Sequence, residues 1–108
     1  MADLYLRDKA AYDEALAASS EKPLLIDFTA SWCPPCQRIA PTFERLAGEN
    51  ADSVTLKKVD VDANAEAAQA AGIQCMPTFK VYKNGAESEK MEGANEQGLI
   101  DLITRAKA

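Results

Sequence analysis

The sequence has no histidine and only three cysteines, Cys33, Cys36 and Cys75, among its 108 residues. A zinc site would need all three cysteines and a carboxylate, whereas structural zinc sites seldom lack a fourth sulfur or imidazole ligand. We therefore expect no metal. Three cysteines are also too few, and an odd number, for the disulfide framework of small secreted domains.

Long hydrophobic runs and an excess of basic charge are missing as well. No run approaches the roughly 18 apolar residues that a membrane-spanning helix needs. The beginning of the chain is charged where a signal peptide has its apolar core, at Asp3, Arg7, Asp8, Lys9, Asp13 and Glu14. The 12 basic and 17 acidic residues give a net charge of -5, which repels phosphate backbones. We expect a cytoplasmic protein with no membrane or nucleic-acid partner.

What the sequence does contain is enough apolar residues, 47%, for one ordinary domain over residues 1–108. Periodicity, capping residues and turn residues predict helices and strands in alternating order. The predicted elements are a strand at 4–6, a helix at 8–18, a strand at 23–30, a helix at 34–49, a strand at 54–61, a helix at 64–71, a hairpin with one strand at 78–83 and a second ending near 92, and a closing helix that Asn95 caps. This order predicts an α/β fold with a central five-stranded mixed sheet and four helices on its two faces.

The stretch "SWCPPCQRIAP" places Cys33 and Cys36 between a buried strand and a helix. The unpaired N–H groups and the positive dipole end of that helix favour a thiolate at Cys33, which is the species that attacks disulfides. Cys36, one turn later, can displace a substrate from a mixed disulfide. Pro34 and Pro35 restrict the loop near helical φ values and leave the Cys36 N–H free to donate to Cys33. The alternative is two cysteines that only pack in the core.

Five stretches of the chain together resemble the thioredoxin family: "DFTASWCPPC", "APTFERL", "KVDVDAN", "CMPTFKVYKNG" and "EGAN". The resemblance implies the thioredoxin fold and a protein-disulfide reductase that needs no cofactor and maintains cell redox homeostasis. It also implies protein disulfides as substrates and re-reduction by a thioredoxin reductase or another thiol donor. Pro34 stands where most members have glycine, as in some plant h-type thioredoxins and in tryparedoxins. The alternatives are a tryparedoxin-like or glutathione-linked carrier and a redox-inactive interaction module with the same fold.

The resemblance makes Cys33 the attacking thiol, Cys36 the resolving thiol and Asp27 a buried acid beneath them. An aspartate inside an apolar strand should have a raised pKa and exchange protons with Cys36, because a buried unpaired carboxylate is unfavourable. The alternative for Asp27 is an ion pair with Lys58. Pro41, inside the second predicted helix, should kink that helix.

The resemblance also implies a substrate groove beside the thiols. Pro77 would be a cis proline facing the disulfide, with the Met76 backbone free to pair with an extended substrate; the alternative is an ordinary trans proline that starts a strand. Trp32 would be an apolar wall beside Cys33, or else a core anchor. Gly93 would be the groove floor, or else a turn glycine.

Cys75 is the cysteine left over from the pair. It precedes Pro77 by two residues and should lie on the rim of the groove. Some animal thioredoxins have a cysteine before Met-Pro, and the resemblance implies that the monomer forms an oxidative dimer through Cys75. The alternative is an inert rim residue, because most unpaired cysteines have no redox role.

Overall fold

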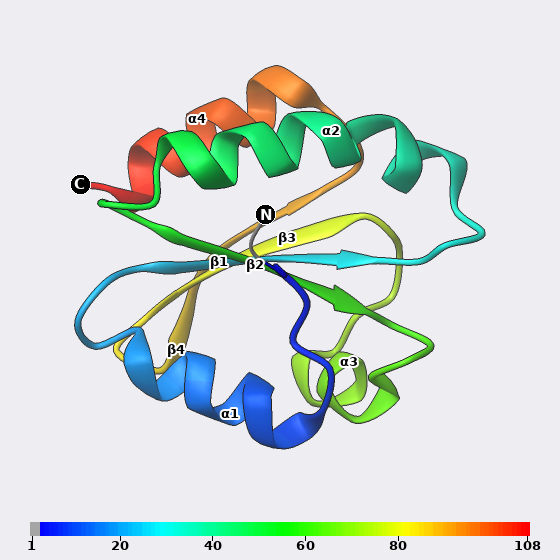
Figure 1. Cartoon of the computed structure of the whole chain (residues 1–108), viewed down its shortest axis with the longest axis horizontal. Helices are drawn as coiled ribbons and strands as arrows, with labels where there is room; N and C mark the ends of the chain where they lie inside the picture. Colours follow the sequence, from blue (N-terminus) through cyan, green and yellow to red (C-terminus); the bar gives the residue numbers. More distant parts are fainter. Residues whose placement is uncertain (1–2) are drawn as a thin grey trace.

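The computed structural model describes residues 3–108 as a sheet covered by helices on both faces (Figure 1). The helices are α1 (Lys9–Ala18), α2 (Pro34–Glu49), α3 (Ala65–Ala71) and α4 (Glu96–Ala106), and the strands are β1 (Leu24–Thr29), β2 (Thr55–Asp60), β3 (Thr78–Lys83) and β4 (Ala86–Glu92). Helices α2 and α4 lie on one face of the sheet, and α1 and α3 lie on the other. The order of the strands is β2-β1-β3-β4. Strand β1 is parallel to β2 and antiparallel to β3, and β3 is antiparallel to β4. The predicted mixed sheet is thus confirmed.

The number of strands is a correction to the prediction, because the sheet described for residues 3–108 has four strands and not five. The segment around Tyr5 touches β2 only through an isolated parallel bridge to Lys58. Two backbone hydrogen bonds of 2.8 Å, from Leu6 N to Lys58 O and from Lys58 N to Leu4 O, make this contact. Asp8 then caps α1 with its side chain, so the segment turns away before it can form a strand.

Strand β1 is the centre of the fold, and all six of its residues are buried. Alternate side chains point to opposite faces, so Leu25 and Asp27 face α2 and α4, whereas Ile26 and Phe28 face α1 and α3. Being covered on both faces explains why this strand is an almost continuous apolar run.

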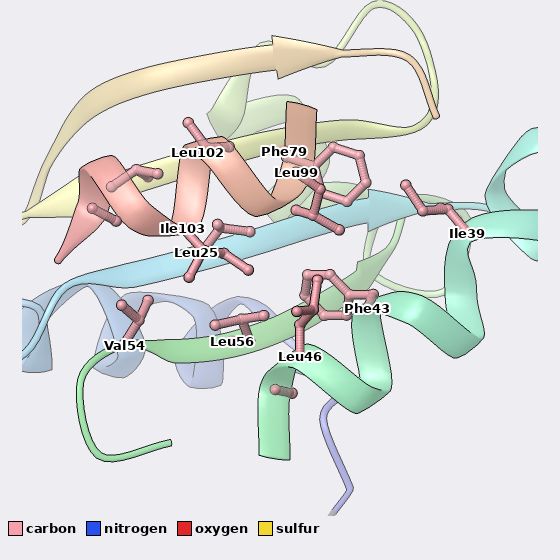
Figure 2. Close-up of a cluster of buried hydrophobic side chains, with 13 residues drawn as sticks. Leu25, Ile39, Phe43, Leu46, Val54, Leu56, Phe79, Leu99, Leu102 and Ile103 are labelled. Carbon is pink, nitrogen blue, oxygen red and sulfur yellow. The ribbon is translucent and has the colours of Figure 1, made fainter. Parts of the chain in front are cut away.

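The larger core fills the space between the sheet and the α2–α4 face (Figure 2). Its side chains come from both helices and from strands β1, β2 and β3, as Phe43, Leu102 and Phe79 illustrate. The rings of Phe43 and Phe79 pack with their centroids 6.0 Å apart. This packing fixes α2, and with it the position of the helix N-terminus that carries the cysteines.

Helices α1, α3 and α4 each begin at a capping residue, as predicted for the closing helix. The side chains of Asp8, Asn64 and Asn95 accept hydrogen bonds from backbone N–H groups in the first turns of α1, α3 and α4. Pro41 lies inside α2 as expected, and the kink expected there stays a prediction. Within residues 3–108, no helix combines the length and the apolar character that crossing a membrane requires.

Candidate active site

Cys33 caps the N-terminus of α2, directly after the loop that follows β1. Its backbone is extended, with φ -100° and ψ 107°, and its sulfur accepts a hydrogen bond of 3.3 Å from the N–H of Cys36. Pro34 and Pro35 occupy the first two helical positions. The N–H groups of these positions have no partner within a helix, so the two prolines remove nothing that the helix needs. The hydrogen bond predicted from the Cys36 N–H to Cys33 is thus present.

The two sulfurs are joined as a disulfide, with the Cα atoms 5.3 Å apart. Cys33 is 5% exposed and Cys36 is fully buried. Both pack against Ala30, Val61 and Met76 in a small cluster of their own. Only Cys33 can therefore be reached from solvent, and this difference separates the two sulfurs chemically.

Asp27 is fully buried in β1, and neither of its carboxylate oxygens has a hydrogen-bond partner among the described residues. Burial raises the pKa of Asp27 to about 7, and the positive charge of Lys58 opposes this rise. The carboxyl group faces α2, the helix that carries Cys36. It can therefore be protonated or ionised near neutral pH, at a place that water reaches poorly.

Lys58 forms no direct ion pair with Asp27, so the alternative interpretation of Asp27 as a paired carboxylate is wrong. Its Nζ contacts Glu44 Oε2 at 3.4 Å and lies 5.0 Å from the centre of the Tyr5 ring. Lys58 is only 5% exposed, and its Cα is the partner of Asp27 in the β1–β2 register. Lys58 acts on Asp27 through its charge and not through a hydrogen bond.

The segment before β3 lies against the cysteines. The Met76–Pro77 peptide bond is cis, which excludes the ordinary trans proline. The carbonyl oxygen of Met76 lies 3.8 Å from Cys33 Sγ. Gly93 N donates to Pro77 O at 2.9 Å, and Gly93 has a φ of 100°, a backbone conformation that favours glycine. The Met76–Pro77 segment thus contacts Cys33 on one side and Gly93 on the other, although the three come from distant parts of the sequence.

Trp32 is 62% exposed, so the alternative of a core anchor is wrong. Its Nε1 donates a hydrogen bond of 2.7 Å to Asp62 Oδ2. This bond holds the indole ring at the surface next to Cys33, with an apolar face available to a partner. Cys75 is exposed in the neighbouring segment, with its sulfur 3.8 Å from Thr78 Oγ1.

Two polar residues of the site were missed by the sequence analysis. Asp62 follows β2, and the carboxyl ends of the parallel strands β1 and β2 meet at one edge of the sheet, so the placement of Asp62 near Trp32 could have been inferred. Gln37 donates from Nε2 to Ala30 O at 2.9 Å and ties α2 to the loop before it. No sequence signal marks Gln37.

Comparison with known proteins agrees with this geometry. The family model described as thioredoxin matches residues 4–105. The chain is 53% identical over 104 residues to a thioredoxin of Geodia cydonium, covering 95% of this chain and 97% of the relative. It is 47% identical over 107 residues to an H-type thioredoxin of Chlamydomonas reinhardtii, covering 97% and 95%. The solved structure of Fasciola hepatica thioredoxin superposes with a TM-score of 0.90 at 41% identity, covering 95% of this chain and 98% of that one.

Proposed function

The chain belongs to the thioredoxin family and is a protein-disulfide oxidoreductase, and from this premise we propose how its residues divide the reaction. The observation that carries the proposal is the Cys33–Cys36 pair at the N-terminus of α2, with one sulfur reachable and the other buried. In the reduced protein, the helix N-terminus and the Cys36 N–H stabilise the Cys33 thiolate. Cys33 is then the group that meets the substrate.

The reaction proceeds by two exchanges of sulfur partners. The Cys33 thiolate attacks one sulfur of the target disulfide, forms a mixed disulfide and releases the other target sulfur as a thiolate. Cys36 then loses its proton and attacks Cys33 Sγ, which releases the second target thiolate. The target has gained two electrons, and the protein is left with the Cys33–Cys36 disulfide seen in the structure.

Asp27 accepts the proton of Cys36 in the second exchange. Its buried carboxyl group has a pKa of about 7 and two oxygens without hydrogen-bond partners among residues 3–108. A base is most effective when its pKa lies near the working pH. Lys58, held by Glu44, keeps part of the Asp27 population ionised and able to accept the proton.

The target binds along the surface that Trp32, Met76, Pro77 and Gly93 form around Cys33. The exposed indole supplies an apolar wall, and the Met76 backbone pairs with an extended target segment. A glycine at position 93 leaves room there, because no atom lies within 4 Å of the position that a Cβ would take.

The proposed setting is the cytoplasm, where thiols are kept reduced. An external donor, either a thioredoxin reductase or a glutathione-like thiol, returns the protein to the dithiol form. The two donors are distinguished by supplying each in turn with the oxidised protein and a protein disulfide. Turnover with only one of them identifies the donor class.

Substituting each cysteine tests the division of roles. With a protein disulfide, Cys36→Ser should accumulate a mixed disulfide on Cys33, because attack remains and resolution is lost, whereas Cys33→Ser should be inactive. Mass spectrometry of the adducts, in a Cys75→Ser background that removes the third thiol, locates the bond. An adduct on Cys36 of the Cys33→Ser protein, with none on Cys33 of the other variant, would reverse the assignment.

A further inference from the structure

Lys80 is a buried lysine that the proposed reaction does not use. It lies in β3 and is 6% exposed. A lysine this buried needs partners for its charge, because burying an unpaired charge is unfavourable. Its Nζ donates to Ala71 O at 2.5 Å and to Glu87 Oε1 at 2.6 Å. One ammonium group therefore joins β3, β4 and the end of α3.

A β-bulge in β4 brings Glu87 to the correct face of the sheet. Val81 is paired with Glu89, but the next residue of β3, Tyr82, is paired with Glu87, so Ser88 is an extra residue. In a regular ladder Ser88 would be opposite Tyr82, and Glu87 would point to the other face. The bulge turns the Glu87 carboxylate to the face on which the Lys80 side chain lies.

The carbonyl that Lys80 holds is the last one of α3. Ala71 ends the helix, and the carbonyls of a last turn have no partner within the helix. A positive charge is also favourable at this negative end of the helix dipole. Lys80 therefore fixes the point at which the chain leaves α3 and enters the segment Gly72–Met76.

The other end of the Gly72–Met76 segment is held from the same face of β3. Thr78 Oγ1 donates to Cys75 O at 2.7 Å, and Thr78 precedes Lys80 by two residues, so both side chains point toward α3. Between these two anchors the segment is partly or fully exposed. Its last carbonyl, Met76 O, lies 3.8 Å from Cys33 Sγ.

We propose that Lys80, held in place by Glu87, is a positioning residue that sets the segment Gly72–Met76 against Cys33 and so governs the binding of extended protein substrates. The inference rests on the proposed pairing of the Met76 backbone with the target. Lys80 touches neither the target nor the reacting sulfurs, so it acts only through the backbone of this segment. A small disulfide reagent that needs no backbone pairing should be reduced equally well without Lys80.

The kinetic test compares Lys80→Met with two further variants. Lys80→Met keeps the unbranched chain and removes the ammonium group, and Glu87→Gln removes only the partner charge. Lys90→Met is the matched control, because Lys90 is the partner of Lys80 in the β3–β4 register, is exposed, and pairs with Glu92 at 3.8 Å. Each pre-reduced protein is mixed with insulin or with 5,5′-dithiobis(2-nitrobenzoate) in single turnovers.

For Lys80→Met, the insulin concentration at half-maximal rate should rise about threefold or more, with the limiting rate and the rate with the small reagent unchanged. Glu87→Gln should show a smaller change in the same direction, and Lys90→Met none. The proposal would be overturned if Lys80→Met left the insulin concentration at half-maximal rate unchanged. It would also be overturned if the variant lost equal reduction rate with insulin and with the small reagent. If Lys80→Met does not fold, Glu87→Gln provides the test. An unchanged insulin concentration at half-maximal rate in Glu87→Gln would then overturn the proposal.

Hydrogen exchange tests the position of the segment without any activity. In Lys80→Met, amide protection should fall in the Gly72–Met76 segment and stay unchanged in β1. A merely structural loss would lower protection across the sheet and would contradict the proposal. If the wild type reduced neither substrate, the proposed function would fail, whereas the exchange experiment would still decide whether Lys80 holds the segment.

Discussion

Asp27 is the residue whose chemistry depends most on its surroundings. Full burial raises the pKa of Asp27, the nearby positive charge of Lys58 lowers it, and the result is a pKa of about 7. Glu44 and the Tyr5 ring hold that charge from outside the sheet. A carboxyl group of this pKa is partly ionised at neutral pH, so it can take up a proton and return it within one catalytic cycle.

Asp27→Asn should slow the resolving step by about a hundredfold or more, which is the lower end of the usual contribution of general acid–base catalysis. In the wild type, release of the target from the mixed disulfide should become faster as the pH rises through about 7, because the ionised carboxylate is the base. The variant lacks this base and should lose that part of the pH dependence. Rapid-quench measurement of mixed-disulfide decay from about pH 5.5 to 8.5 provides the check. Identical profiles for the two proteins would reject the proton-transfer role.

The same substitution should stabilise the fold, and the gain should depend on pH. The folded-state pKa of about 7 lies above the unfolded value near 3.8, so the folded protein binds more protons and loses stability as the pH rises between these values. The gain in Asp27→Asn should therefore be small near pH 4, grow toward pH 7 and then level off, reaching at most about 4 kcal/mol. Urea unfolding of both proteins at several pH values measures it. A gain that shrank as the pH rose would contradict the assigned pKa.

Single residues differ in how well the sequence predicts their role. Asp27 could be identified because a charge inside an apolar run must be buried with the strand. Lys80 could not, because its partners Ala71 and Glu87 come from two other elements and Glu87 faces it only through a bulge. The sequence shows the type of each side chain, whereas burial and partners depend on long-range packing.

At the scale of elements, local signals determined the helices better than they determined the sheet. Capping residues and the two prolines act on backbone groups a few residues away, and the helices begin where these signals indicate. A strand exists only through its neighbour, so the apolar pattern at 4–6 could not show that pairing with β2 stops after two hydrogen bonds. The predicted fifth strand is wrong for this reason.

Gly93 gives an element-scale prediction at the junction between β4 and α4. Gly93→Ala should destabilise the protein by about 1–2 kcal/mol, because an L side chain is strained at a φ of 100° although no atom lies within 4 Å of its Cβ. Gly48→Ala is the matched control: Gly48 lies inside α2 with equal free space, and alanine there should stabilise by about 0.5–1 kcal/mol. Midpoints of denaturant unfolding check both signs. If both substitutions shifted the unfolding midpoint equally and in the same direction, the positive φ of Gly93 would not explain the effect.

At the scale of the whole molecule, the larger core and the proposed target surface are built from different parts of the chain. The larger core, between the sheet and α2 with α4, holds the N-terminus of α2 in place (Figure 2). The proposed target surface uses Trp32, Met76 and Gly93, which come from distant parts of the sequence. The reactive pair is a local motif that four residues encode, whereas the surface that we propose for target binding exists only in the complete fold.

The exposed thiol on that surface leads to a prediction about association between molecules. Cys75 directly precedes Met76, whose backbone we propose to pair with the target, and its exposed sulfur lies 3.8 Å from Thr78 Oγ1. Mild peroxide should join two molecules through Cys75, since two thiols and one peroxide give one disulfide and two waters. The bond would place a second molecule over the proposed target surface, so disulfide reduction should be lost until a thiol breaks the bond.

Non-reducing electrophoresis and disulfide-reductase activity, measured on the same samples, follow dimer formation and the loss of activity. Cys75→Ser should keep full activity and form no dimer; a dimer band that survives this substitution, or never appears in the wild type, would leave Cys75 as a passive part of the groove rim.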